Sequence, residues 1–171
     1  MRRSASRRGR HRDARGPIRV FLSRSRGGKL ESRPSSPQEL IITPLEIAAA
    51  AAALADRKKG VDVKVYDVSD HLRVADYFVL VSGLSRPHVK ALYDEIHVQL
   101  KALGENHTRA EGADLGWWVL LDYVDVVVHI LQPEARSYYE LDQLYGECPL
   151  VDVTKVALPE FKDPHAAPLA E

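Results

Sequence analysis

The stretch that decides the fold is residues 118–145, which read WVLLDYVDVVVHILQPEARSYYELDQLY. Its first half holds two runs of β-branched and other apolar residues, 118–123 and 126–131, with only two residues between them. Runs of this composition and length predict β-strands, and so short a connection favours antiparallel pairing of the two strands. The first half is therefore predicted to be a β-hairpin.

The second half predicts a helix. Pro133 suits the first helical turn, where an N–H group would have no partner in any case. Apolar and aromatic residues then continue through Tyr138 and Leu144 to Tyr145, and Gly146 can end the helix. One continuous helix is expected from Pro133 to Tyr145.

A first helix is predicted at about residues 44–59. Thr43 and Glu46 are spaced as a capping box, in which each side chain bonds the other residue's backbone N–H. The alanine-rich run 48–55 has high helix propensity and allows close packing against a sheet, and Gly60 stops the helix.

Two strands, a helix and a short strand fill the interval before the hairpin. The runs 61–66 and 77–81 predict strands, and the second is apolar enough to be covered on both faces. Ser85 is a suitable cap for a helix whose apolar residues recur at helical spacing over 89–103. A short strand is expected near 107–110.

The predicted element order is thus αββα(β)ββα. This order indicates an α/β fold in which helices pack on a four- or five-stranded mixed sheet. Residues 41–148 form the expected domain. Residues 1–40 are too charged to fold and predict a disordered basic extension, and 149–171, with several prolines, predict an irregular tail.

Charge is divided unevenly along the chain. Residues 1–40 hold twelve Lys and Arg against three Asp and Glu, a net charge of +9, so the remainder carries −9 in a chain of zero formal charge. An acidic body favours a basic partner surface over unspecific contact with phosphates.

The basic extension has three interpretations, and the sequence leaves them open. It can make weak contacts with RNA by releasing counterions. It can be a transit peptide, which would place the protein in a mitochondrion or plastid rather than in the cytoplasm. Or translation starts later, at a valine or leucine codon such as Val20 or Leu40, since Met1 is the only methionine.

Cys148 is the only cysteine, so an intramolecular disulfide and a CxxC redox or zinc site are excluded, and a reducing compartment fits. The longest apolar run, 47–55, is far too short to cross a bilayer. We therefore expect a soluble, cytoplasmic protein with no membrane partner.

No motif for enzymatic chemistry is present. The sequence lacks GxxxxGK[ST], GxGxxG, HExxH and GxSxG, so no cofactor is predicted. Asp76, Asp122 and Asp125 could together hold magnesium, as carboxylates do in nucleotidyltransferases. The loop 82–85 is followed by Arg86 and proline, where such an enzyme would carry a closely spaced acidic pair. The alternative is that these carboxylates form turns or face a partner, with no metal.

Aromatic residues crowd into the last third of the chain. Residues with an apolar body and a polar group commonly anchor protein interfaces, although ordinary core packing is the alternative for some of them. Exposed aromatics would also suit contacts between two copies of the chain, as in a homodimer. The residues concerned are Trp117, Trp118, Tyr123, Tyr138, Tyr139 and Tyr145.

The motifs 118–129 and 132–145, together with 76–85 and the pair Glu111-Gly112, resemble the RsfS/Iojap family of ribosomal silencing factors over residues 43–147. The resemblance implies a nucleotidyltransferase-like fold without the catalytic residues, and thus no enzyme. It implies binding to the large ribosomal subunit through ribosomal protein L-fourteen, which blocks joining of the small and large subunits and represses translation. Organellar members of the family act in large-subunit assembly.

By motif position, the resemblance implies seven partner-binding residues: Trp118, Asp122, Tyr123, Asp125, His129, Tyr138 and Leu141. The sequence does not separate those that contact the partner from those that support the fold. Val124 replaces the family's usual glycine, so the hairpin turn either lacks a left-handed residue or tolerates strain. Pro87-His88 stands where polar residues commonly open the second helix, and Tyr145 replaces a tryptophan.

Three hypotheses follow. The first is a translation repressor or subunit-assembly factor that acts by binding alone. The second is a divergent metal-dependent nucleotidyltransferase, and the third is a homodimeric structural module.

Overall fold

The structure, a computed structural model, describes residues 42–107 and 109–161. The predicted extension 1–40 lies outside these residues, as does the end of the predicted tail. The division of the chain at residues 40 and 148 therefore stays a prediction.

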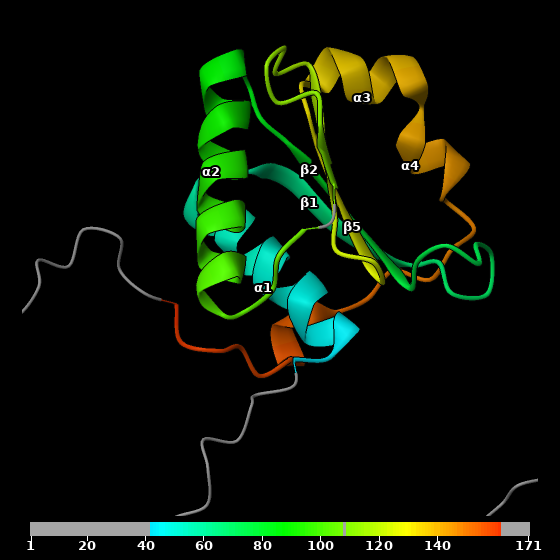
Figure 1. The fold of residues 1–171 in the computed structure, drawn as a ribbon. Helices are drawn as coiled ribbons and strands as arrows, with labels where there is room; N and C mark the ends of the chain where they lie inside the picture. Colours follow the sequence, from blue (N-terminus) through cyan, green and yellow to red (C-terminus); the bar gives the residue numbers. More distant parts are fainter. Residues whose placement is uncertain (1–41, 108, 162–171) are drawn as a thin grey trace, which may run out of the picture. The chain divides into compact units, whose positions relative to one another are not determined.

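The core of the fold is a five-stranded mixed sheet, which confirms the predicted α/β class (Figure 1). The strands lie in the order β1-β2-β5-β4-β3, and only β2 and β5 pair in parallel. The expected hairpin is present as β4 and β5. The strand bounds are β1 Val61–Asp67, β2 Tyr77–Ser82, β3 Arg109–Glu111, β4 Trp118–Asp122 and β5 Val126–Leu131.

Helices cover the two faces of this sheet differently. The long helices α1 (Pro44–Arg57) and α2 (Arg86–Ala102) pack on one face, whereas the short helices α3 (Pro133–Tyr139) and α4 (Leu141–Leu144) lie on the other (Figure 1). Alternation along β5 divides its side chains accordingly. Ile130 joins the core under α1 and α2, and its neighbour Leu131 joins the core under α3.

The start of α1 is the predicted capping box. The Glu46 N–H donates to Thr43 Oγ1 over 3.3 Å, and the Thr43 N–H donates to Glu46 Oε2 over 2.7 Å. The helix ends at Arg57, two residues before the predicted end, because Lys59 takes a left-handed backbone with φ 60°. Its alanines are buried from Ala48 to Ala52, so the helix backbone lies close to the sheet.

Residues that follow the last helix close one edge of the sheet. The Asp67 N–H donates to the Pro149 carbonyl over 2.9 Å, and the Val151 N–H donates to the Val65 carbonyl over 2.9 Å. A 3₁₀ turn, Val153–Lys155, then leads the chain along the α1 side of the domain. These two bonds satisfy outer backbone groups of Val65 and Asp67, near the end of β1.

The prediction of one continuous helix over residues 133–145 was wrong. Glu140 adopts a left-handed backbone with φ 49° and separates α3 from α4. Asp142 in α4 accepts hydrogen bonds from Arg136 in α3 across this break. This tertiary ion pair outweighs the helical spacing of the apolar residues, which was the signal for continuity.

The turn between β4 and β5 has a left-handed residue at Val124, so of the two alternatives predicted for this turn the strained one is present. Val124 has φ 71°, and its N–H donates to Asp122 Oδ1 over 2.8 Å. The hairpin closes through the Tyr123 N–H, which donates to the Val126 carbonyl over 2.8 Å. A β-branched residue thus occupies a position whose backbone conformation favours glycine.

Replacing Val124 with glycine is expected to stabilise the fold by about 1 kcal/mol, because glycine adopts a positive φ without the steric cost that valine bears. Urea unfolding of the wild type and Val124→Gly measures the difference. Val124→Ala is the control, since alanine keeps a Cβ and should gain less. A glycine variant less stable than the wild type would contradict the strain at this turn.

Candidate functional site

The sheet face that carries α3 and α4 is covered only in part. Over β3, β4 and β5, the side chains of Trp118, Leu120, Asp122 and Val127 remain half-buried. Strand register places them together, because Asp122 lies opposite Val127 and Leu120 lies opposite His129. These four half-buried residues are called the open face below.

An aromatic cluster of Trp118, Tyr138 and Tyr139 borders the open face at its α3 end. The ring centroids of Trp118 and Tyr139 are 4.8 Å apart, and those of Tyr139 and Tyr138 are 5.0 Å apart at an interplanar angle of 87°. Tyr138 is 77% exposed and Tyr139 is 45% exposed. The cluster therefore presents aromatic surface to solvent, fixed by packing of its own rings.

Trp118 is held from beneath by His129. The indole Nε1–H donates to His129 Nδ1 over 3.2 Å, and the imidazole packs edge-on against Phe78 with centroids 5.0 Å apart. His129 is only 5% exposed. Burial lowers the pKa of His129 to about 4, so the ring is neutral at pH 7.

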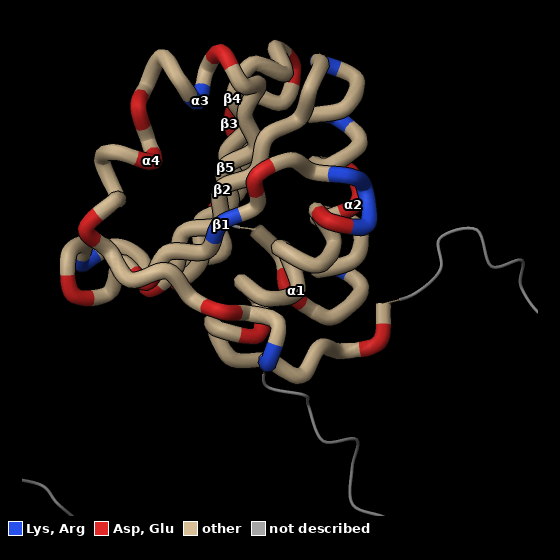
Figure 2. The backbone as a smooth tube through the Cα atoms, turned by 180° about the vertical axis from the view of Figure 1, so that it is seen from behind, with Lys and Arg blue, Asp and Glu red and all other residues tan. Residues whose placement is uncertain are grey.

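Acidic residues surround this surface. Asp125 is exposed at the hairpin turn, and Glu111 lies on β3 beside the open face, paired with Arg109. Figure 2 shows mainly acidic positions along α3, α4 and the segments next to them. In the sequence these include Glu134, Glu140 and others as far as residue 147. The combination of aromatic rings with carboxylates suits a basic protein surface.

The seven predicted site residues divide into two groups. Trp118, Asp122, Asp125 and Tyr138 are exposed or half-buried and can meet a partner directly. Three are buried and can only support the surface: Tyr123, His129 and Leu141, which are 5%, 5% and 4% exposed.

The structure also places these residues relative to one another. Trp118, Asp122 and His129 share one sheet face, with Tyr138 at its end. Tyr123 belongs to the opposite core, under α1 and α2, where burial raises its pKa strongly.

Leu120, Val127 and Tyr139 were not among the predicted site residues. Leu120 and Val127 follow from strand alternation, since each lies an even number of residues from a predicted one on its strand. Tyr139 was named only among the aromatic residues that could anchor an interface. Its place beside Trp118 depends on how α3 packs on the sheet.

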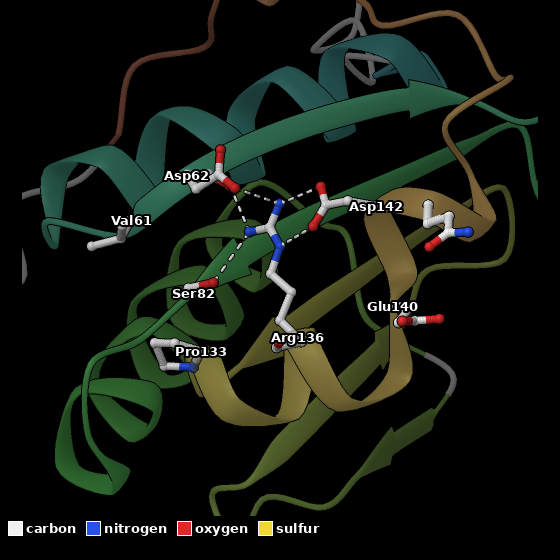
Figure 3. Close-up of a pocket in the computed structure, with 9 residues that line it drawn as sticks. Val61, Asp62, Ser82, Pro133, Arg136, Glu140 and Asp142 are labelled. Carbon is white, nitrogen blue, oxygen red and sulfur yellow. Dashed lines mark hydrogen bonds and ion pairs between the residues drawn. The ribbon is translucent and has the colours of Figure 1, made fainter.

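A buried ion pair holds α3 and α4 in position. Arg136 is 6% exposed, and its Nε and one terminal nitrogen donate to the two oxygens of Asp142 over 2.6 and 2.8 Å. The other terminal nitrogen donates to the Asp62 carbonyl over 2.7 Å and to Ser82 Oγ over 3.2 Å (Figure 3). These four residues are called the Arg136 clamp. It joins α3 and α4 to the start of β1 and the end of β2.

Asp142 is the common acceptor of the Arg136 clamp. It also accepts from Lys64 Nζ over 2.8 Å and from Tyr66 Oη over 3.1 Å. Hydrogen bonds from Arg136 above all, and also from Lys64 and Tyr66, hold the pKa of Asp142 well below its usual range. The shallow hollow beside Arg136, of about 480 Å³, is lined by these paired charges together with Glu140 and with uncharged residues such as Val61 and Pro133.

The three aspartates considered as magnesium ligands lie around the hairpin turn, where Asp76 and Asp125 contribute backbone groups and Asp122 contributes its carboxylate. The Asp76 N–H donates to the Asp125 carbonyl over 2.8 Å, and Asp122 accepts from the turn. Within residues 42–107 and 109–161, no group of three or more His, Cys, Asp or Glu is arranged to hold a metal ion. None of the helices in the same residues is long and apolar enough to cross a membrane.

Comparisons with known proteins show what this chain is similar to. The family model described as "Ribosomal silencing factor during starvation" matches residues 42–169. The chain is 41% identical over 109 residues to ribosomal silencing factor RsfS of Bacillus subtilis, covering 64% of this chain and 90% of that protein. It is 33% identical over 87 residues to the mouse protein named mitochondrial assembly of ribosomal large subunit protein 1, covering 49% of this chain and 38% of that one.

A solved structure supports the fold. A crystal structure of a protein from Chromobacterium violaceum superposes with a TM-score of 0.60 at 31% sequence identity. The match covers 75% of this chain and 99% of that chain.

Replacing Asp142 with asparagine is expected to destabilise the protein by about 2 kcal/mol, because the buried guanidinium loses the nearer of its two carboxylate partners among the described residues and keeps Asp62, 3.0 Å away, in a site partly open to water. Urea unfolding at pH 7 measures this. Asp94→Asn is the matched control, since Asp94 pairs with Lys90 on the exposed side of α2 and should change stability by less than about 0.5 kcal/mol. Equal losses in the two variants would rule out a special role for the Arg136 clamp.

Acidification should destabilise the fold through His129. The unfolded chain binds a proton near pH 6.5, whereas the folded ring resists it until about pH 4, so stability falls as pH drops through this window. From pH 7 to pH 5 the contribution of His129 is about 2 kcal/mol. Urea midpoints of the wild type and His129→Asn, taken at both pH values, isolate it. Identical pH dependence in the two proteins would contradict a neutral, buried His129.

Proposed function

The chain belongs to the family of ribosomal silencing factors, and from that premise we propose that it represses translation by binding the large ribosomal subunit through ribosomal protein L-fourteen. The open face and the aromatic cluster form the contact surface. The bound protein then prevents the small subunit from joining. Binding alone accounts for this activity, with no chemical step.

The observation that carries the proposal is the joint position of aromatic, apolar and acidic groups on one side of the sheet. Trp118 and Tyr139 pack together at 4.8 Å, so little side-chain freedom is left to lose on binding. Half-buried Leu120 and Val127 supply apolar area beside them. Such a centre, rimmed by polar groups, is the usual anatomy of a protein interface.

Charge determines the kind of partner. Residues 41–171 carry a net charge of −9, and ribosomal proteins that contact RNA need basic surfaces. Exposed carboxylates such as Asp125 speed the encounter with a basic face, and the aromatic cluster then provides affinity after water is expelled.

Repression in this proposal is steric. A folded body fixed on the intersubunit side of the large subunit occupies space that the small subunit requires. Because this effect needs only occupancy, repression should scale with the fraction of large subunits bound.

A role in assembly of the large subunit is the second candidate, favoured by the similarity to the mouse protein. The same binding surface would serve it. In that case the protein would act on incomplete subunits in an organelle, whereas silencing acts on mature subunits, in the cytoplasm of a bacterium.

Sedimentation in sucrose gradients tests the proposal. The protein is expected to run with free large subunits and to reduce the yield of joined ribosomes when added before small subunits. It should also bind isolated L-fourteen protein. Absence from both large subunits and L-fourteen would reject the silencing function. Enrichment on incomplete subunits only would favour assembly.

Truncation of an anchor tests the aromatic cluster. Tyr138→Ala is expected to weaken binding to large subunits about thirtyfold, as loss of a central aromatic anchor typically does. Val98→Ala on α2, also exposed, is the matched control and should leave the affinity unchanged. Equal affinities of the two variants would exclude Tyr138 as an anchor.

Charge reversal tests the acidic rim. Asp125→Lys is expected to slow association about tenfold at low salt and less at high salt, because steering by exposed charges is screened. Asp56→Lys on α1 is the control, on the opposite side of the sheet. Association rates come from surface plasmon resonance with L-fourteen protein at two salt concentrations. A salt-independent effect would argue against steering.

A further inference from the structure

We propose that His129 is a positioning residue of this interface, which accepts the Trp118 indole N–H and so turns the ring to offer a partner its π-face and carbon edge. The partner group that fits is the side chain of a lysine or arginine. This inference rests on the proposed function, since it assigns a role within that contact surface.

The hydrogen bond joins side chains on two neighbouring strands, β4 and β5. Trp118 on β4 lies opposite Leu131, and His129 on β5 lies opposite Leu120, so the two residues are diagonal neighbours on one face. Long side chains reach each other in such a diagonal arrangement. The Nε1 to Nδ1 distance of 3.2 Å and the ring centroids 5.8 Å apart fit a direct bond.

The bond fixes the protonation of the imidazole. Because the indole donates to Nδ1, Nδ1 carries no proton, and the neutral ring carries its proton on Nε2. Nε2 is buried and has no hydrogen-bond partner among the described residues. A buried donor without a partner costs free energy.

Because the Nε2–H, unpartnered among the described residues, costs free energy, a histidine at this position needs a compensating role. Phe78, Leu80 and Leu131 form an apolar layer around residue 129. A leucine at this position would itself bring no unsatisfied polar atom into the layer. What a leucine cannot supply is an acceptor for the indole. The buried histidine is therefore explained by the orientation of Trp118 and not by core packing.

A charged imidazole would break the arrangement, since Nδ1–H would then face the indole N–H, donor against donor. Among the described residues, the ring contacts and the hydrogen bond of His129 come from Phe78 of β2 and Trp118 of β4. Both groups are uncharged. Burial lowers the pKa of His129, which keeps the acceptor available at neutral pH.

The orientation of the Trp118 indole determines which of its atoms a partner can contact. With its N–H turned inward, Trp118 has no donor for a carbonyl or carboxylate of the partner. Tyr139 packs against the indole at 4.8 Å and narrows the accessible surface to ring face and edge. Such a surface beside carboxylates attracts the cationic group and apolar stem of lysine or arginine.

The first experiment examines the free protein. In a Trp117→Phe background only Trp118 contributes an indole N–H resonance, because the chain has two tryptophans. His129→Leu should move this resonance upfield and speed its exchange with water. His129→Asn should keep it close to the wild-type position, since Asn Oδ1 stands where Nδ1 does. An unchanged, protected resonance in the leucine variant would overturn the hydrogen bond.

The second experiment is a binding cycle with purified large subunits. Trp118→Ala should weaken binding at least about tenfold, His129→Leu about fivefold, and His129→Asn by less than about twofold. In a Trp118→Phe background, where no indole N–H remains, His129→Leu should cause no further loss. A further fivefold loss there would show that His129 supports the fold in general, and would overturn its positioning role.

The outcomes separate the two proposals. If Trp118→Ala and Tyr138→Ala both bind normally, the proposed contact surface fails. If Trp118→Ala binds weakly while a folded His129→Leu binds as the wild type does, the surface stands and the positioning role fails. Should His129→Leu unfold, the asparagine variant decides: an indole signal and an affinity that are both kept or both lost support the role, and a change in one without the other overturns it.

Discussion

The buried guanidinium of Arg136 is the constraint on which the functional surface depends. A charge removed from water must find acceptors in fixed places, and Arg136 finds them on Asp142, Asp62 and Ser82. The helix break at Glu140 lets Asp142 turn back to it. Because the clamp fixes α3 on the sheet, it also fixes the aromatic rings that α3 carries beside β4.

Much of the fold was predictable because its signals are local. The spacing of the two hairpin strands, the capping box at Thr43 and the cap at Ser85 each depend on a few neighbouring residues, and each appears in the structure. The helix break at Glu140 was missed for the opposite reason. The break depends on the ion pair of Arg136 with Asp142, whose position is set by contacts with β1 and β2. No pattern of neighbouring residues predicts it.

For the candidate site, the sequence could name residues but not their burial or their side of the sheet. Sequence motifs identified Trp118 and Tyr138 but could not distinguish contact residues from supporting ones, since strand parity relative to the core was unknown. The register places Tyr123 on the α1 side of the sheet and His129 on the α3 side, and burial then sets His129 apart from the more exposed residues of its own face. Tyr139 required the packing of α3, which only the three-dimensional structure provides.

The pairing of residues 149–151 with the end of β1 bears on how the protein avoids aggregation. A strand with free backbone groups is a template on which other chains aggregate, and here residues 149–151 already pair with the end of β1, at Val65 and Asp67. The opposite border is β3, only three residues long, with Arg109 and Glu111 as charged side chains. Because part of one border is paired and the other border is short and charged, copies of the chain find less free edge along which to polymerise.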